Sequence, residues 1–140
     1  MESNIEKVDD NFMTIVYSDY LQKDIMVCIS DELDACEEEL TLGYRKEISS
    51  FINAMAQWYQ LVYDAISDWA KKQYDTSLKT SDIELMIVYV LFEQTEQEKY
   101  GLSFRLTFDI EHGCGVQIVV EDGQYSVIKI GSADVAFEIY

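Results

Sequence analysis

Several residue types are absent or scarce in this sequence, and each scarcity removes a class of protein. There is no proline, so the usual sign of a stiff linker between domains is missing. The three cysteines are odd in number and lack the spacing of a metal site, which predicts reduced thiols. The longest strongly apolar run, residues 85–92, is too short to span a bilayer. These features favour one domain without a membrane segment.

The N-terminal residues also lack the basic and then apolar pattern of a signal peptide, so we expect a cytoplasmic protein. A length of 140 residues falls within the usual size of one domain. Hydrophobic residues make up 49% of the chain and aromatic residues 13%, which is far too apolar for a disordered segment. Residues 1–140 are therefore predicted to fold as a single domain.

Basic residues are few: 10 Lys and Arg stand against 27 Asp and Glu, which gives a formal net charge of -17. A negative surface of this size repels phosphate backbones and anionic lipids, and it attracts basic protein surfaces. We therefore expect a basic protein partner, with neither direct nucleic-acid binding nor membrane association.

The acids are densest in residues 30–39, which contain no base. One interpretation is a solvated segment that keeps the protein soluble. The other is a recognition surface that steers a basic partner into contact. Under the second interpretation the partner-binding residues are Asp31, Glu32, Asp34, Glu37, Glu38 and Glu39.

Six segments have the composition or alternation of β-strands. Residues 12–17 and 24–29, joined by a short polar connection, predict a hairpin. The other four are a buried strand at residues 85–92, two alternating strands at 104–110 and 116–121, and a return strand at 125–130 after Asp122-Gly123. These four predict an antiparallel meander, and residues 133–140 follow as a short helical turn or an extended edge.

Between the hairpin and the meander, residues 44–74 show apolar side chains at spacings of three and four, which predicts an amphipathic helix. The apolar positions are Ile48, Phe51, Ile52, Met55, Tyr59, Val62, Ile66 and Trp69. The expected fold class is α+β: an antiparallel sheet of about six strands, with an N-terminal hairpin and a C-terminal meander, packed on one long amphipathic helix.

The cluster most suggestive of catalysis or metal binding surrounds His112, the only histidine, with Asp109, Glu111 and Cys114 close by in sequence. A hydrolytic Cys-His pair needs the base to reach the sulfur, and residues this close in a turn between paired strands rarely converge. Metal binding needs further ligands from elsewhere, because alternating side chains of a strand point to opposite faces. We expect the carboxylates and the imidazole to bond backbone groups at a hairpin.

No glycine-rich phosphate loop, nucleophile elbow, dinucleotide fingerprint or calcium loop occurs, so we expect no cofactor and no metal. Trp58, Tyr59, Tyr63 and Trp69 lie at helical spacing, and such aromatic residues usually belong to a core. Of these, Trp58 and Tyr63 lie at the edges of the apolar stripe and are the better candidates for partial exposure.

The last forty residues resemble a known family. Residues 104–116 read FRLTFDIEHGCGV, Gly123 follows, and residues 130–137 read IGSADVAF. This pattern is similar to that of a family of small, uncharacterised bacterial domains with an Asp-x-Glu-His-Gly turn and an aspartate before Ala-Phe. Such domains often look like immunity proteins of bacterial toxin systems. The resemblance implies an α+β inhibitor that masks a toxin, and a structural role for the turn.

Charge and resemblance together lead to one main hypothesis and two alternatives. The main hypothesis is an immunity-type protein that neutralises a basic toxin, such as a nuclease, by masking its site. A second hypothesis is a phage inhibitor that imitates nucleic acid and binds a bacterial defence nuclease. The third is a small enzyme that uses the His112 turn. We expect a binding protein and no enzyme.

Overall fold

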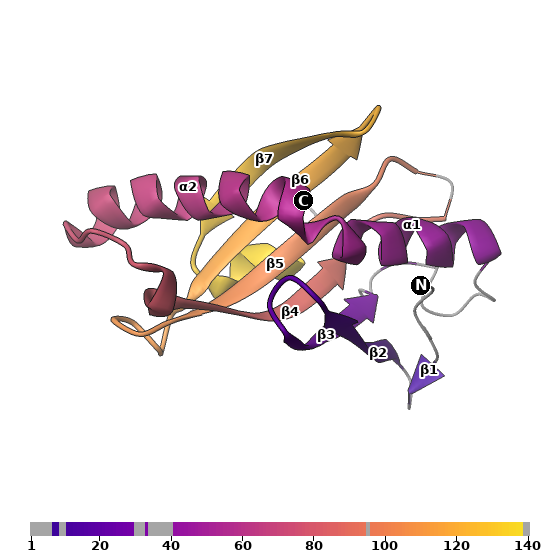
Figure 1. Ribbon diagram of the computed structural model, residues 1–140, viewed down its shortest axis with the longest axis horizontal. Coiled ribbons are helices and arrows are strands. Elements are labelled where there is room, and N and C mark those ends of the chain that lie inside the picture. The colour runs from indigo at the N-terminus through magenta and orange to yellow at the C-terminus, as the bar shows by residue number, and fades with distance from the viewer. Residues whose placement is uncertain (1–6, 9–10, 30–32, 34–40, 95, 139–140) are drawn as a thin grey trace.

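The computed structural model describes residues 7–8, 11–29, 33, 41–94 and 96–138. Figure 1 shows two helices that run one after the other across the strands of a single sheet. The elements in chain order are β1 (Lys7–Val8), β2 (Asn11–Ser18), β3 (Lys23–Ile29), α1 (Leu42–Asn53), α2 (Met55–Tyr74), η2 (Thr80–Asp82), β4 (Ile83–Val90), β5 (Lys99–Leu106), β6 (Cys114–Glu121), β7 (Gln124–Gly131) and η3 (Ala133–Phe137). Within the described ranges, no helix has the length and apolar character needed to cross a membrane.

Strands β2 to β7 form the main sheet in chain order, and the two-residue strand β1 pairs with β2. The hairpin β2–β3 and the meander β4–β7 are antiparallel, as the alternation of residues predicts. Strands β3 and β4 are parallel, because the chain between them crosses the sheet through both helices. The α+β class with six mostly antiparallel strands is confirmed, and the expectation of a purely antiparallel sheet is wrong at this one junction.

Strand β5 begins at Lys99, five residues before the start of the strand predicted at residues 104–110. Tyr100 is fully buried and pairs with Ile118 of β6, so the chain is already in the sheet at this point. The strand ends at Leu106, and Phe108 and Ile110 lie in the turn that follows. Burial of Tyr100 against the helices outweighs the polar character of its neighbours.

The predicted single helix over residues 44–74 is wrong, because the helix is broken at Ala54. The backbone of Ala54 has φ -90° and ψ 15°, and the next turn is tightened by a bond from Gln57 N to the Ala54 carbonyl at 2.7 Å. The indole Nε1 of Trp58 donates to the Phe51 carbonyl at 2.8 Å. A side chain thus satisfies this backbone acceptor beside the break.

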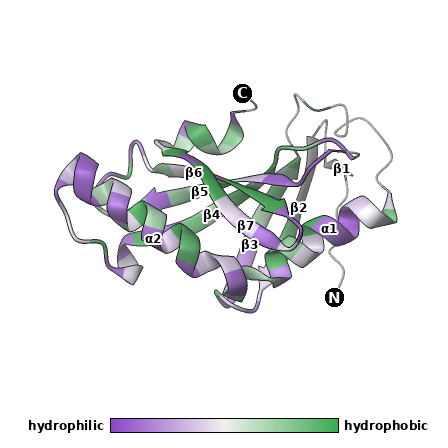
Figure 2. Cartoon of the chain, turned by 90° about the horizontal axis from the view of Figure 1, so that it is seen from above, coloured by the Kyte–Doolittle hydropathy of each residue, from purple (hydrophilic) through white to green (hydrophobic). Residues whose placement is uncertain are grey.

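The apolar stripe of both helices contacts one face of the sheet. Phe51 stacks on Tyr100 of β5 with a centroid distance of 3.8 Å, and on its other neighbour Trp58 at 4.5 Å. Tyr59 of α2 meets Phe104 of β5 edge to face at 6.2 Å. Figure 2 shows the sheet between these helices on one side and the η3 turn on the other.

The η3 turn lies directly on two glycines of the sheet. A Cβ atom on Gly101 would lie 1.5 Å from the Ala136 carbonyl oxygen, and one on Gly115 would lie 2.6 Å from the Ala136 nitrogen. Beside them, the Gln117 side-chain amide donates to the main-chain oxygens of Val135 at 2.8 Å and Glu138 at 2.7 Å. The GCG and GSADVAF segments of the sequence are therefore two halves of one packing unit.

Candidate functional site

The six carboxylates predicted to bind a partner lie outside the described residues: Asp31, Glu32, Asp34, Glu37, Glu38 and Glu39. Within this stretch only Leu33 is described, and its side chain is buried in the core cluster. The partner-binding role of the acidic stretch stays a prediction.

The turn around His112 is a hydrogen-bonded junction between α2 and the β5–β6 connection. Tyr74, the last residue of α2, donates its hydroxyl to Asp109 Oδ2 at 2.6 Å. His112 Nδ1 lies 3.0 Å from Asp109 Oδ1. The bonds with Tyr74 and then His112 lower the pKa of Asp109, and the bond with Asp109 raises the pKa of His112. The His112 side chain is 65% exposed.

Cys114, two residues further on, belongs to the core instead of to this turn. Its side chain is fully buried, and burial raises the pKa of the thiol to about 12. A protonated thiol inside the core is not a nucleophile at neutral pH. Across the described part of the chain, no three His, Cys, Asp or Glu side chains are grouped so as to hold a metal ion.

Of the aromatic residues considered for partial exposure, Trp58 is fully buried, so that expectation is wrong. Its indole needs a partner when buried, and the Phe51 carbonyl supplies one. Tyr63 is half-buried as expected, and its hydroxyl donates to the Leu78 carbonyl at 3.0 Å. With Tyr59 and Tyr20 it lines a cavity of about 390 Å³ beside the β2–β3 turn.

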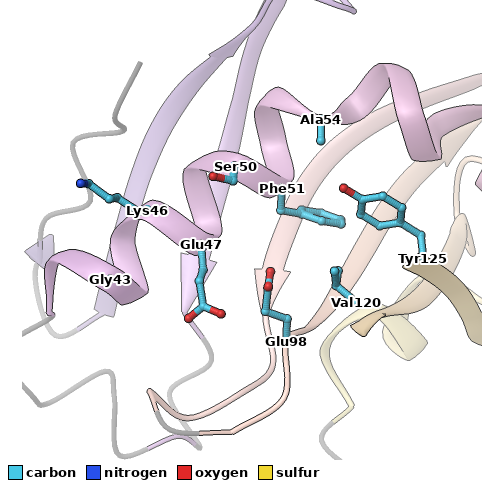
Figure 3. Close-up of a pocket in the computed structure, with 9 residues that line it drawn as sticks. All are labelled: Gly43, Lys46, Glu47, Ser50, Phe51, Ala54, Glu98, Val120 and Tyr125. Carbon is cyan, nitrogen blue, oxygen red and sulfur yellow. The ribbon is translucent and has the colours of Figure 1, made fainter. Parts of the chain in front are cut away.

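A second cleft, of about 360 Å³, lies between α1 and the strands β5 to β7, and Figure 3 shows its lining. Helix α1 contributes most of one wall, and the residue before β5 and residues of β6 and β7 contribute the other. The lining residues are Gly43, Lys46, Glu47, Ser50, Phe51, Ala54, Glu98, Val120 and Tyr125.

Two carboxyl groups from distant parts of the chain face each other in this cleft (Figure 3). Burial is the largest cause that raises the pKa of Glu47, followed by the negative charge of Glu98 and a hydrogen bond with Glu98. The Tyr100 hydroxyl lies 2.8 Å from Glu98 Oε2 and 3.4 Å from the Glu47 main-chain oxygen. The Lys46 ammonium group points away from the pair in Figure 3.

The wall beside the carboxyl groups is aromatic and fixed in place. Phe51 is held between Trp58 and Tyr100, so its ring cannot swing aside. The ring centroid of Tyr125 in β7 lies 6.3 Å from that of Phe51, and Tyr125 is half-buried. Burial and then the charge of Glu98 raise the pKa of Tyr125. The cleft thus combines two acidic groups with an aromatic side, an arrangement suited to an organic cation.

Sequence reasoning did not single out Glu47 or Glu98. Glu47 stands one turn of helix before Phe51, so its place near the edge of the apolar stripe could have been found from periodicity. Glu98 reaches the cleft because its carbonyl accepts from Val120 N at 3.1 Å, which continues the β5–β6 ladder by one residue. Only the pairing of strands reveals that contact.

The fold and the cleft define an α+β protein with an acidic, aromatic-sided cavity between its first helix and its sheet. Comparison with models of protein families, with curated proteins and with solved structures found no match to this chain.

Proposed function

We propose that this chain is an acidic binding domain that inhibits a basic protein by covering the functional surface of that protein, as immunity proteins do with toxins. The observation that carries the proposal is the Glu47–Glu98 carboxyl pair, held together in a cleft of a chain with a formal net charge of -17. Like charges in contact repel, and a cation from a partner relieves that repulsion. Binding of a basic surface therefore relieves a repulsion that the free protein carries in this cleft.

Charge also governs how fast such a complex forms. A strongly negative domain attracts a positive partner over a distance of about one Debye length, roughly 8 Å at physiological ionic strength, and orients it during approach. The acidic stretch with Glu37, Glu38 and Glu39 supplies further carboxylates for this steering. In this proposal the stretch guides the partner, and the cleft holds it.

The likeness of residues 104–137 to immunity-type domains supports an inhibitor, and the geometry gives those residues a supporting role. Gly115 and Ala136 pack against each other, and the Asp109 turn joins α2 to the sheet. These contacts stabilise the scaffold. Recognition is accordingly assigned to the acidic surfaces, and a nuclease with a basic substrate channel is the kind of toxin that such a surface fits.

A capture experiment followed by kinetics tests the proposal. The tagged protein is used to isolate its partner from cells that encode it, and the purified pair is studied by stopped-flow mixing at several salt concentrations. We expect a basic partner whose association rate falls steeply as salt rises, and whose activity is blocked in the complex. An acidic partner, a rate independent of salt, or a partner that stays active in the complex would refute the proposal.

Charge-reversed variants locate the steering surface. Replacement of Glu37, Glu38 and Glu39 by lysine is expected to slow association by about tenfold or more and to flatten its salt dependence. The matched control reverses three exposed acids elsewhere, Asp68, Glu111 and Glu121. Equal slowing in both variants would remove the acidic stretch from the mechanism. Displacement of the protein by duplex DNA from a shared site would instead support nucleic-acid imitation.

A further inference from the structure

We propose that the cleft between α1 and strands β5 to β7 binds the side chain of one arginine from the basic partner. The inference rests on the proposed function for the source of the arginine, and on the cleft itself for its chemistry. It assigns a specific ligand to a cavity whose lining combines two acidic groups with two aromatic side chains.

The size of the cleft suits one side chain. Small-molecule sites occupy roughly 300 to 1,000 Å³, and this cavity of about 360 Å³ lies at the small end of that range. Gly43 at the start of α1 leaves open space where another residue would place a Cβ atom. A single long side chain therefore fits in the cleft.

The two acidic groups match the geometry of a guanidinium group. Glu47 comes down from α1 and Glu98 comes up from the strand side, so a flat cation beside the pair can contact both carboxyl groups (Figure 3). A guanidinium group carries five N–H donors in a fixed plane and bonds two acceptors at once. An ammonium group is compact and strongly hydrated, and it loses more solvation on entering such a site. A divalent metal ion needs more oxygen ligands than this pair provides.

The aromatic wall favours the same ligand. Tyr125 lies on the strand side of the cleft beside Phe51 (Figure 3), close enough for the charge of Glu98 to raise its pKa. An aromatic ring at this position can pack on the guanidinium plane or on the aliphatic stem of arginine. Phe51 cannot retreat, because its ring is stacked between Trp58 and Tyr100. The Tyr100 hydroxyl bonds Glu98 and fixes the carboxyl group before any ligand arrives. A preorganised site of this kind loses little entropy on binding.

The test uses the full chain and small probes, followed by nuclear magnetic resonance of the backbone amides. The probes are N-acetyl-arginine methylamide, its lysine counterpart and its neutral citrulline counterpart. We expect the arginine probe to bind with a Kd of the order of millimolar and to shift amides of α1 and of the β6–β7 hairpin. The lysine probe should bind several-fold more weakly and the citrulline probe at least tenfold more weakly.

Two variants test whether the arginine probe recognises the carboxyl groups of the cleft or only the net negative charge of the protein. The double variant E47Q/E98Q should lose at least about tenfold in affinity for the arginine probe, because both acceptors lose their charge. The matched control D68N removes one exposed acid of α2 and should bind like the wild type. Both glutamines keep the side-chain shape, and E47Q alone serves if the double variant does not fold. Amide shifts confined to other surfaces, equal binding of the citrulline probe, or equal losses in D68N and E47Q would overturn the inference.

The outcome also distinguishes this inference from the proposed function. If a basic partner binds and E47Q/E98Q binds it as tightly as the wild type does, the arginine site is wrong and the proposed function survives. If the arginine probe binds in the cleft and the captured partner is not basic, the proposed function is wrong and the chemistry of the site stands.

Discussion

Replacement of Gly101 by alanine is the most direct test of how the C-terminal segment is held on the sheet. The added Cβ atom would lie 1.5 Å from the Ala136 carbonyl oxygen, and the usual C···O contact is about 3.3 Å or more. The η3 turn must therefore move away by roughly 1.8 Å. This displacement breaks the two bonds from Gln117 to Val135 and Glu138, of 2.8 and 2.7 Å.

The expected loss of stability is the sum of an overpacking cost and the cost of the two broken hydrogen bonds. Overpacking costs about 1–3 kcal/mol, and each lost hydrogen bond costs about 1 kcal/mol, so we expect G101A to lower the free energy of unfolding by about 3–5 kcal/mol. Urea denaturation monitored by tryptophan fluorescence measures this loss. The control is G43A on α1, where nothing lies within 4 Å of the new Cβ atom, and where alanine should stabilise the helix by about 0.5–1 kcal/mol. A loss below about 1 kcal/mol in G101A would refute the packing of η3 on β5.

Three further predictions concern single side chains. The pKa of Glu47 is raised in the folded chain, so ionisation of this carboxyl group lowers the stability of the wild type as pH rises through that pKa. E47Q should therefore have a higher Tm than the wild type at pH 7. This difference in Tm should vanish below about pH 4, where Glu47 is protonated in both the folded and the unfolded state. With the other two cysteines replaced by serine, Cys114 should resist alkylation at pH 8 and react only after unfolding in urea, since burial raises its pKa to about 12. W58F leaves the Phe51 carbonyl without the 2.8 Å indole bond, and should cost about 1–3 kcal/mol in urea denaturation.

The parts of the fold that the sequence predicts well are those governed by local pattern. Alternation placed β7 because its side chains alternate between exposed and half-buried over most of the strand. Strand β6 was placed by the same pattern, although residues 114–118 are buried on both faces, between the helices and the η3 turn. The apolar stripe of residues 44–74 likewise matches side chains that are buried or half-buried. Both signals depend only on which neighbours along the chain share a face.

The features that escaped prediction depend on partners distant in sequence. Ala54 is a strong helix former, so nothing local marks the break; the bond from Trp58 to Phe51 becomes visible only in three dimensions. The parallel contact between β3 and β4 follows from the route of the whole helical connection. Glu47 and Glu98 come together because α1 crosses the end of β5, which no spacing rule encodes.

The arrangement of the molecule predicts that stability and recognition are separable. The glycine-supported η3 turn lies on the face of the sheet opposite the helices (Figure 2). The acidic cleft lies on the helix side. Substitutions at Gly101 and Gln117 should therefore lower the free energy of unfolding while leaving the Kd for the arginine probe unchanged in the folded fraction. E47Q and E98Q should instead weaken binding of the arginine probe without lowering the free energy of unfolding. If a destabilised but folded variant of the η3 contact weakened probe binding as much as E47Q does, the two faces would be coupled, and the assignment of recognition to the cleft alone would fail.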